Sequence, residues 1–161
     1  MRLKDIKWLT LAILLILLDQ TVKFFVAEGL SQTDSIAIIP HVVNFIYVKN
    51  TGAAFSMFSD KTVILGLVSI VFCIGVICLW FMKREKHFML ELSLALLFSG
   101  AFGNAIDRIF RGYVVDFIET AFIKFPVFNI ADIAITFGTV CLMIYLIFFD
   151  RTETVREDKT Q

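Results

Sequence analysis

Two aspartates in apolar surroundings are the residues whose type and placement best suit chemistry. Asp116 interrupts the apolar stretch Tyr113–Ile118, and Asp132 directly precedes the apolar run that begins at Ile133. Two carboxyl groups that share a site cannot both ionise cheaply, so one of them keeps a proton. Such a pair supplies a base that takes a proton from water and an acid that protonates a carbonyl oxygen and then a leaving amine. The chemistry that fits is peptide hydrolysis without a covalent intermediate or a metal ion.

Each aspartate also has a simpler structural interpretation. Asp132 follows Asn129 at spacing i, i+3, where both residue types are favoured as helix caps. Asn129 suits the cap, and one cap does not need a second carboxylate a turn deeper, so we interpret Asp132 as functional. Asp116 alone would be an ordinary loop aspartate. It gains weight because the short segment 110–127 must bring the ends of two helices together.

A second charged pair lies in the first apolar block. Asp19 and Lys23 are at spacing i, i+4, so they share a helix face and can pair. Ionisable residues at membrane depth are costly and are candidates for function by default. Two interpretations stay open for this pair: a self-neutralising pair that snorkels to the membrane surface, or a contact with substrate or lipid head group.

A third polar cluster ends the third apolar block. Asn104, Asp107 and Arg108 are at spacing i, i+3, i+4 and fall on one helix face. We favour a structural network here, because an adjacent arginine keeps the carboxyl group of Asp107 ionised and so makes it a poor proton donor. Just before this cluster, Ser99 and Gly103 form a small-x-x-x-small pair, which predicts the close approach of another helix.

Other chemistries lack their residues. His41 and His87 are isolated and no H-E-x-x-H motif occurs, so we predict neither a zinc site nor a Ser–His protease, and no cofactor. The cysteines have no C-x-x-C pairing and lie inside apolar blocks, as packing residues do: Cys73, Cys78 and Cys141. A proton relay or transporter is the alternative class. Against it, the charges gather at one membrane face, and the inner halves of the third and fourth blocks offer no ionisable path.

The elements that must position these residues are transmembrane helices. The chain is 58% hydrophobic, above the roughly 45–50% of soluble domains, and the excess is gathered in long blocks. Blocks of about 20 apolar residues span a bilayer. We therefore predict an all-α polytopic membrane protein, a single domain over residues 1–150 followed by a polar cytoplasmic tail, 151–161. The predicted helices cover residues 8–27, 62–82, 88–109 and 128–149.

Basic residues in the short flanks predict the orientation. One side of a four-span arrangement receives Arg2, Lys4, Lys7, Lys83, Arg84, Lys86, Arg151, Arg156 and Lys159. The other side receives Lys49, Lys61, Arg111 and Lys124, with Arg108 at the membrane edge. The positive-inside rule then places both termini in the cytoplasm.

Two segments face the opposite, outer side. The first, about 28–61, contains His41–Lys49, whose β-branched and aromatic residues predict one or two strands on the membrane surface. Asn50–Ser56 reads as a turn and a stretch of small residues. The second segment carries Asp116, which would lie near Asp132 at the outer membrane edge.

The chain resembles lipoprotein signal peptidase (signal peptidase II, aspartyl peptidase family A8) over nearly its whole length. Any one of the shared motifs is weak, but all occur in order on four predicted spans. They are Asp19-x-x-x-Lys23, Asn50-x-Gly52-Ala-Ala-Phe55-Ser56, Gly103-Asn104-x-x-Asp107-Arg108, Gly112-Tyr-Val-Val-Asp116-Phe and Phe128-Asn129-x-Ala131-Asp132. The first glycine of the family's glycine pair before the Asn motif is Ser99 here, which is still small.

The resemblance implies an intramembrane aspartyl endopeptidase. It would remove signal peptides from diacylglyceryl-modified bacterial prolipoproteins and cut just before the lipidated cysteine. The implied fold is four transmembrane helices with a small extracytoplasmic β-sheet cradle and an extended loop on the outer leaflet. The implied location is the bacterial cytoplasmic (inner) membrane, with the active site near the outer face.

The resemblance also assigns roles to residues. The catalytic role falls on Asp116 and Asp132. The substrate-binding or supporting role falls on Asp19, Lys23, Asn50, Gly52, Asn104, Asp107, Arg108 and Asn129. The implied partners are lipid-modified prolipoproteins, membrane phospholipid and cyclic peptide inhibitors of the globomycin type. We expect a monomer and no nucleic-acid partner, because no basic stripe is present.

Overall fold

The computed structural model describes residues 3–52, 61–82 and 87–149. In that part of the chain, four helices are long and apolar enough to cross a membrane. They are α1 (Leu3–Gly29), α2 (Thr62–Met82), α3 (Phe88–Phe110) and α4 (Ile130–Phe148). A three-stranded antiparallel sheet completes the fold, with β1 (Ser35–Ile39), β2 (Val43–Asn50) and β3 (Val114–Thr120). The predicted fold class is confirmed. The predicted tail, 151–161, lies outside the described residues.

Two helix starts differ from the hydropathy prediction for physical reasons. Helix α1 starts at Leu3, before the apolar block, because a helix can continue through charged residues where it leaves the membrane. Helix α4 starts at Ile130 and not at residue 128, because Asn129 has extended backbone and forms the N-cap. Hydropathy locates the segment that can lie in lipid, and capping locates the end of the helix.

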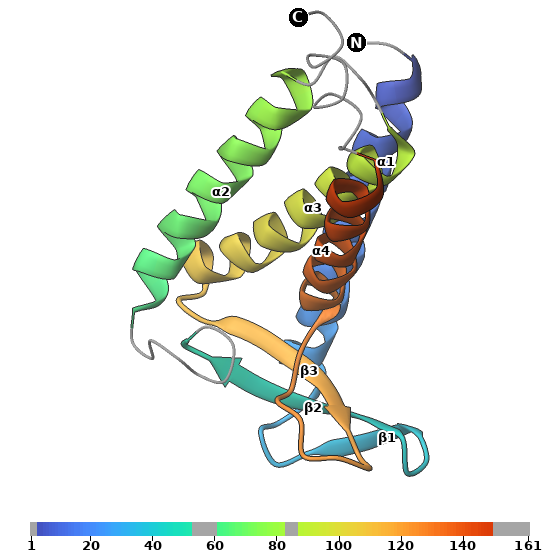
Figure 1. Cartoon of the computed structure of the whole chain (residues 1–161). Helices are drawn as coiled ribbons and strands as arrows, with labels where there is room; N and C mark the ends of the chain where they lie inside the picture. Colours follow the sequence, from blue (N-terminus) through green and yellow to red (C-terminus); the bar gives the residue numbers. More distant parts are fainter. Residues whose placement is uncertain (1–2, 53–60, 83–86, 150–161) are drawn as a thin grey trace, which may run out of the picture.

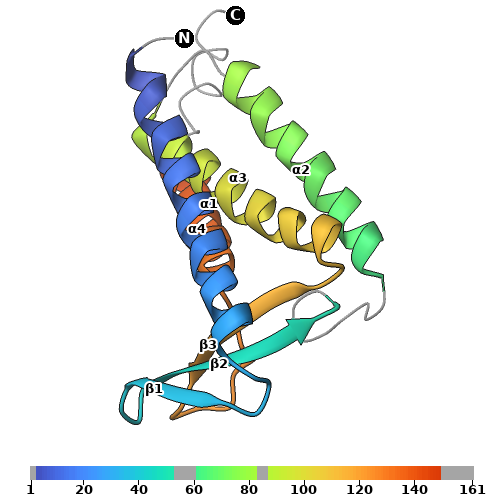
Figure 2. The same ribbon diagram turned by 180° about the vertical axis from the view of Figure 1, so that it is seen from behind.

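Helix α3 is the central helix of the bundle. In its membrane-crossing segment 67% of residues are buried, against 22% in each of the other three helices. It packs against α1, α2 and α4, and the main packing of α2 is along α3 (Figures 1 and 2). The residues that α2 buries recur along one face, at Thr62, Gly66, Cys73 and Val76. The remaining surfaces of α1, α2 and α4 are apolar and exposed, as lipid-facing surfaces are.

The close approach of α3 and α4 occurs at Gly100. A Cβ atom added there would lie 2.3 Å from the carbonyl oxygen of Ala131, so no larger residue fits without moving a helix. Ser99 and Gly103, the pair for which a close approach of helices was predicted, make other contacts. Gly103 leaves room for the carboxyl group of Asp19, which would lie 2.9 Å from an added Cβ. Ser99 is buried and its hydroxyl donates to Leu96 O of its own helix.

The sheet lies at one end of the helices, and the start of α1 and the end of α4 lie at the other end (Figure 1). Strand β2 runs in the middle and pairs with β1 and β3. The segment Tyr113–Ile118 was predicted as part of a loop, but most of it forms β3. Its pairing partner is distant in the chain: Asn50 lies opposite Val114, and Val48 opposite Asp116.

One face of the sheet packs on the end of α1. Its buried core consists of Val26, Tyr47, Val115 and Phe117. Because side chains alternate along a strand, Val115 and Phe117 point into this core while Asp116, between them, points to the opposite face. The packing of the sheet on α1 therefore decides the direction in which Asp116 points.

A buried carboxyl group lies at the opposite end of the bundle from the sheet. Glu91 of α3 is 8% exposed, and its Oε2 accepts a hydrogen bond of 2.8 Å from Trp8 Nε1 of α1. The inner half of the third helix therefore carries one buried ionisable group, whereas the prediction from sequence concerned a continuous ionisable path across the membrane. The carboxylate of Glu91 in α3 is stabilised by the indole N–H of Trp8 in α1. Spacing along one helix does not reveal such a pairing between two helices.

Candidate active site

Asp116 is held by two asparagines from different elements. It lies on β3, is 3% exposed, and both of its carboxyl oxygens accept hydrogen bonds. Asn50 Nδ2, at the end of β2, donates to Oδ2 over 2.8 Å. Asn129 Nδ2, at the start of α4, donates to Oδ1 over 2.7 Å. The carboxyl group is thus almost fully buried, and the two hydrogen bonds fix its orientation.

Asp132 lies in the first turn of α4 and remains partly exposed. It forms a capping box with Asn129: Asp132 N donates to Asn129 Oδ1 over 2.9 Å, and Asn129 N donates to Asp132 Oδ2 over 3.2 Å. Asp132 therefore belongs to the cap, contrary to the prediction that the cap does not need this second carboxylate. Its other oxygen, Oδ1, accepts a hydrogen bond of 2.8 Å from Asn104 Nδ2.

Asn129 connects the two aspartates. Its side-chain nitrogen contacts Asp116, and its backbone nitrogen contacts Asp132. The same side-chain nitrogen lies 3.2 Å from Asn104 Oδ1. The residue predicted as a helix cap is a cap, and it also holds both carboxyl groups at one site.

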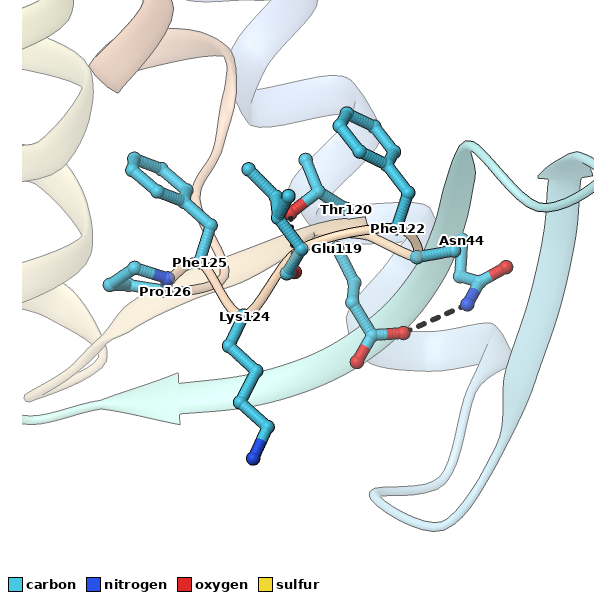
Figure 3. Close-up of a pocket in the computed structure, with 9 residues that line it drawn as sticks. Asn44, Glu119, Thr120, Phe122, Lys124, Phe125 and Pro126 are labelled. Carbon is cyan, nitrogen blue, oxygen red and sulfur yellow. Dashed lines mark hydrogen bonds between the residues drawn. The ribbon is translucent and has the colours of Figure 1, made fainter.

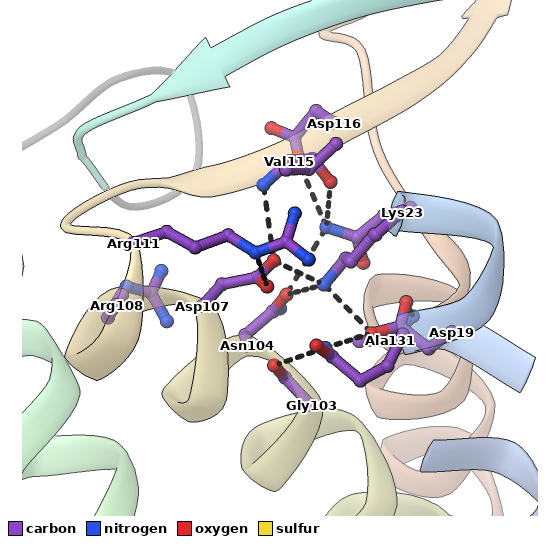
Figure 4. A network of polar contacts seen from close by, with 12 residues as sticks. Asp19, Lys23, Gly103, Asn104, Asp107, Arg108, Arg111, Val115, Asp116 and Ala131 are labelled. Atoms are coloured by element: carbon purple, nitrogen blue, oxygen red, sulfur yellow. Dashed lines mark hydrogen bonds and ion pairs between the residues drawn. The ribbon is translucent and has the colours of Figure 1, made fainter. Parts of the chain in front are cut away.

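A buried ammonium group organises the polar cluster next to Asp116 (Figure 4). The side chain of Lys23 is 0% exposed, and its Nζ lies 2.8 Å from Asp19 Oδ2, 3.0 Å from Asp107 Oδ2 and 2.9 Å from Asn104 Oδ1. These contacts match the three hydrogens of an ammonium group. The predicted pairing of Asp19 with Lys23 is confirmed. The alternative in which the pair snorkels to the membrane surface is wrong, because both residues are enclosed by other helices.

The acids around Lys23 tie other elements together. Asp19 Oδ1 accepts from Ala131 N at the start of α4, over 3.0 Å. Asp107 Oδ2 accepts from Val115 N of β3, over 3.2 Å. One buried cluster therefore fixes α1, α3, β3 and the start of α4 relative to one another, and these include the elements that carry Asp116 and Asp132.

The arginine beside Asp107 has a different partner from the one predicted. Arg108 Nη2 donates to Gly52 O over 3.3 Å, whereas Arg111 Nε lies 3.6 Å from Asp107 Oδ1 (Figure 4). Arg111, one helical turn after Asp107, was overlooked as a supporting residue, although its i, i+4 spacing was visible. Gly52 also donates its N–H to Asn50 Oδ1 over 2.9 Å, which orients the amide that contacts Asp116.

The pKa of Asp116 is raised from 3.8 to about 6. Burial is the largest cause, because it penalises the charged form. The hydrogen bonds from Asn50 and Asn129 act in the opposite direction, and the nearby negative charge of Asp132 raises the pKa further. Two carboxyl groups in unequal environments result, one buried with a raised pKa and one open to solvent at its edge. This arrangement suits a shared acid and base.

Comparisons with known proteins agree with this architecture. The family model described as signal peptidase (SPase) II matches residues 11–148. The chain belongs to the signal peptidase II family.

Similar family members come from several bacteria. The lipoprotein signal peptidase of Lactobacillus gasseri is 35% identical over 152 residues, which cover 94% of this chain and 99% of that protein. That of Streptococcus agalactiae serotype V is 40% identical over 137 residues, with 84% and 88% covered. A solved bacterial membrane enzyme superposes with a TM-score of 0.84 at 33% identity, covering 88% of this chain and 87% of that one.

Membership of the signal peptidase II family makes the chain a multi-pass membrane peptidase and supports the removal of signal peptides from prolipoproteins. The structure brings all the residues predicted for the site to the sheet end of the bundle. They are Asp19, Lys23, Asn50, Gly52, Asn104, Asp107, Arg108, Asp116, Asn129 and Asp132. The rest of the motif that starts at Asn50, residues 53–56, lies outside the described part of the chain.

Proposed function

We propose that this chain is an aspartyl endopeptidase that cleaves diacylglyceryl-modified bacterial prolipoproteins just before the lipidated cysteine. Asp116 and Asp132 are the catalytic pair in this proposal. The observation that carries it is Asn129, which donates one hydrogen bond to each carboxyl group, over 2.7 and 3.2 Å. A cap alone would need only the contact with Asp132.

The two carboxyl groups divide the chemistry according to their surroundings. Asp116, with a raised pKa, holds a proton and donates it to the carbonyl oxygen of the scissile bond. Asp132, which is partly exposed, removes a proton from the attacking water. A tetrahedral diol forms. Its breakdown returns one diol proton to Asp116 and sends the proton on Asp132 to the leaving nitrogen, so both groups are restored.

The other residues of the site position this pair. Asn50 orients Asp116, and Asn104 orients Asp132. Lys23, Asp19 and Asp107, with Arg111 beside Asp107, form a charge-balanced support for the pair. Arg108 is a cation at the rim that can bind a backbone carbonyl of the substrate, since its Nη2 already contacts one such group, that of Gly52.

The membrane supplies the orientation of the substrate. A diacylglyceryl group contributes about 0.8 kcal/mol per buried CH₂, so it fixes the depth of the cysteine that carries it. A fixed depth presents the neighbouring peptide bond to carboxyl groups at the membrane edge and converts a chance encounter into an intramolecular step.

The proposal extends to location and partners. The basic flanks favour cytoplasmic termini, which puts the sheet and the aspartates on the outer side of the inner membrane. The enzyme works there as a monomer among phospholipids. Cyclic peptides of the globomycin type inhibit it by occupying the site of the two aspartates.

Gel mobility of one purified prolipoprotein tests the proposal. The protein is incubated in detergent with the same substrate before and after lipid attachment, and the Asp132→Asn variant serves as the inactive control. The lipidated form should be cut, and the unmodified form should be cut far more slowly. Equal rates for the two forms would refute the lipid as a recognition element and leave a general intramembrane aspartyl protease.

A further inference from the structure

The chain segment between the two aspartates is unusually apolar for a loop outside the helices. Residues 121–127 connect β3, which carries Asp116, to α4, which carries Asp132. Three of its side chains are largely exposed: Phe122 at 64%, Ile123 at 52% and Phe125 at 51%. Exposed aromatic clusters of this kind mark contact with a protein or a membrane.

The loop separates its apolar and charged side chains by direction. Phe122 and Phe125 project toward the side on which the helices stand, and Lys124 projects to the opposite side (Figure 3). These residues border an open cavity of about 740 Å³ that is also lined by Asn44 and Glu119. The charged groups therefore face away from the bilayer that the helices cross, and the aromatic rings face toward it.

Hydrogen bonds fix the loop to the sheet at both ends. Ala121 N donates to Val42 O over 3.0 Å, and Thr120 Oγ1 donates to Ile123 O over 3.3 Å. At the other end Phe128 pairs with Ile118, with N···O distances of 2.8 and 3.1 Å. A change in the position of the loop therefore moves β3 and the start of α4 with it.

We propose that the loop 121–127 inserts Phe122, Ile123 and Phe125 into the lipid leaflet next to the sheet, and that this contact sets the depth of both aspartates. Aromatic residues favour the membrane–water interface, where their rings lie at the level of the head groups. Near the end of α1, Phe24 and Phe25 are likewise 53% and 66% exposed. The role in setting depth rests on the proposed function, whereas lipid contact does not.

Spin-label accessibility tests the contact independently of activity. The native cysteines Cys73, Cys78 and Cys141 are replaced by alanine, and a nitroxide is attached to Phe122→Cys, Phe125→Cys or Lys124→Cys. In vesicles of phosphatidylglycerol and phosphatidylethanolamine, positions 122 and 125 should collide more with oxygen and position 124 more with a water-soluble nickel chelate. Equal nickel accessibility at all three positions would overturn the proposal, even if the enzyme is fully active.

Cleavage in the same vesicles tests the consequence for depth. The Phe122→Ser/Phe125→Ser double variant should lose activity by on the order of 10–100-fold, as expected for a small misplacement of reacting groups. Its thermal unfolding temperature should stay unchanged, and Lys124→Ser should retain full activity. Full activity of the double variant would refute the role in setting depth. If the parent protein does not cleave the substrate at all, the result counts against the proposed function and not against the role in setting depth.

Discussion

The buried ammonium group of Lys23 donates a hydrogen bond of 2.9 Å to the side-chain oxygen of Asn104. An ammonium group can only donate, so it fixes which end of the amide is oxygen. The NH₂ end must then point to Asp132, to whose Oδ1 it donates over 2.8 Å. Through Asn104, the buried lysine thereby decides the hydrogen bonding of Asp132, one of the two carboxyl groups proposed to be catalytic.

The Lys23→Met variant should be strongly destabilised, because it leaves Asp19 buried without its cation and Asp107 with only Arg111, 3.6 Å away. Removing one partner of a buried ion pair costs about 3–5 kcal/mol. Thermal unfolding of the purified protein in detergent measures the effect. Lys124→Met, which removes an exposed lysine, is the control and should unfold at the parent temperature. Equal unfolding temperatures for the two variants would contradict the structural role of Lys23.

The Gly100→Ala variant should lose both stability and activity. Its new methyl group would meet the carbonyl oxygen of Ala131 at 2.3 Å and push α4, with Asp132, away from α3. Overpacking of this kind costs about 1–3 kcal/mol. Gly75→Ala in α2 meets nothing within 4 Å and is the matched control. Wild-type behaviour of Gly100→Ala would show that the helices do not pack this closely.

The pH dependence of kcat/KM should report the proton on Asp116. Burial raises the pKa of this carboxyl group to about 6, so the acid form is present below that pH and is lost as the pH rises through it. The hydrogen bond from Asn50 lowers this pKa. In Asn50→Ala the pKa should rise further, and the basic limb of the profile should move to higher pH. Asn44→Ala on the same strand, which loses only a contact with Glu119, should leave the limb unmoved. A shift to lower pH in Asn50→Ala would refute the assignment.

Cysteine labelling in intact cells checks the orientation. With the native cysteines replaced, a reagent that cannot cross the membrane should label Asp34→Cys and should not label Glu85→Cys. The reason is the excess of basic residues on the side of Glu85. The reverse pattern would place the aspartates in the cytoplasm and remove the proposed substrate from their reach.

Much of the fold could be predicted because membrane spans have a simple physical signature. The apolar segment predicted at 62–82 coincides with α2, since nothing but length and hydropathy is needed to define it. The pairing of Asp19 with Lys23 follows equally from helical spacing. These features depend on neighbours within one helix.

Features that depend on contacts between distant segments could not be predicted. Strand β3 was missed because its partner, β2, lies far away in the chain. The pairing of Trp8 with Glu91 joins residues from α1 and α3, and Arg108 contacts Gly52 although Asp107 is its neighbour in sequence. Sequence spacing shows which residues share a face, and only the packing of helices shows what that face meets.

Cleavage of a lipidated prolipoprotein by Asp116→Asn and Asp132→Asn tests the central claim most directly. Each variant should cut at least about 10²–10⁴-fold more slowly than the parent, because each removes one member of the acid–base pair. Both should remain inserted in the membrane and folded. Asp34→Asn, which changes an exposed aspartate, should cut at the parent rate. Normal turnover by either Asp116→Asn or Asp132→Asn would contradict the account.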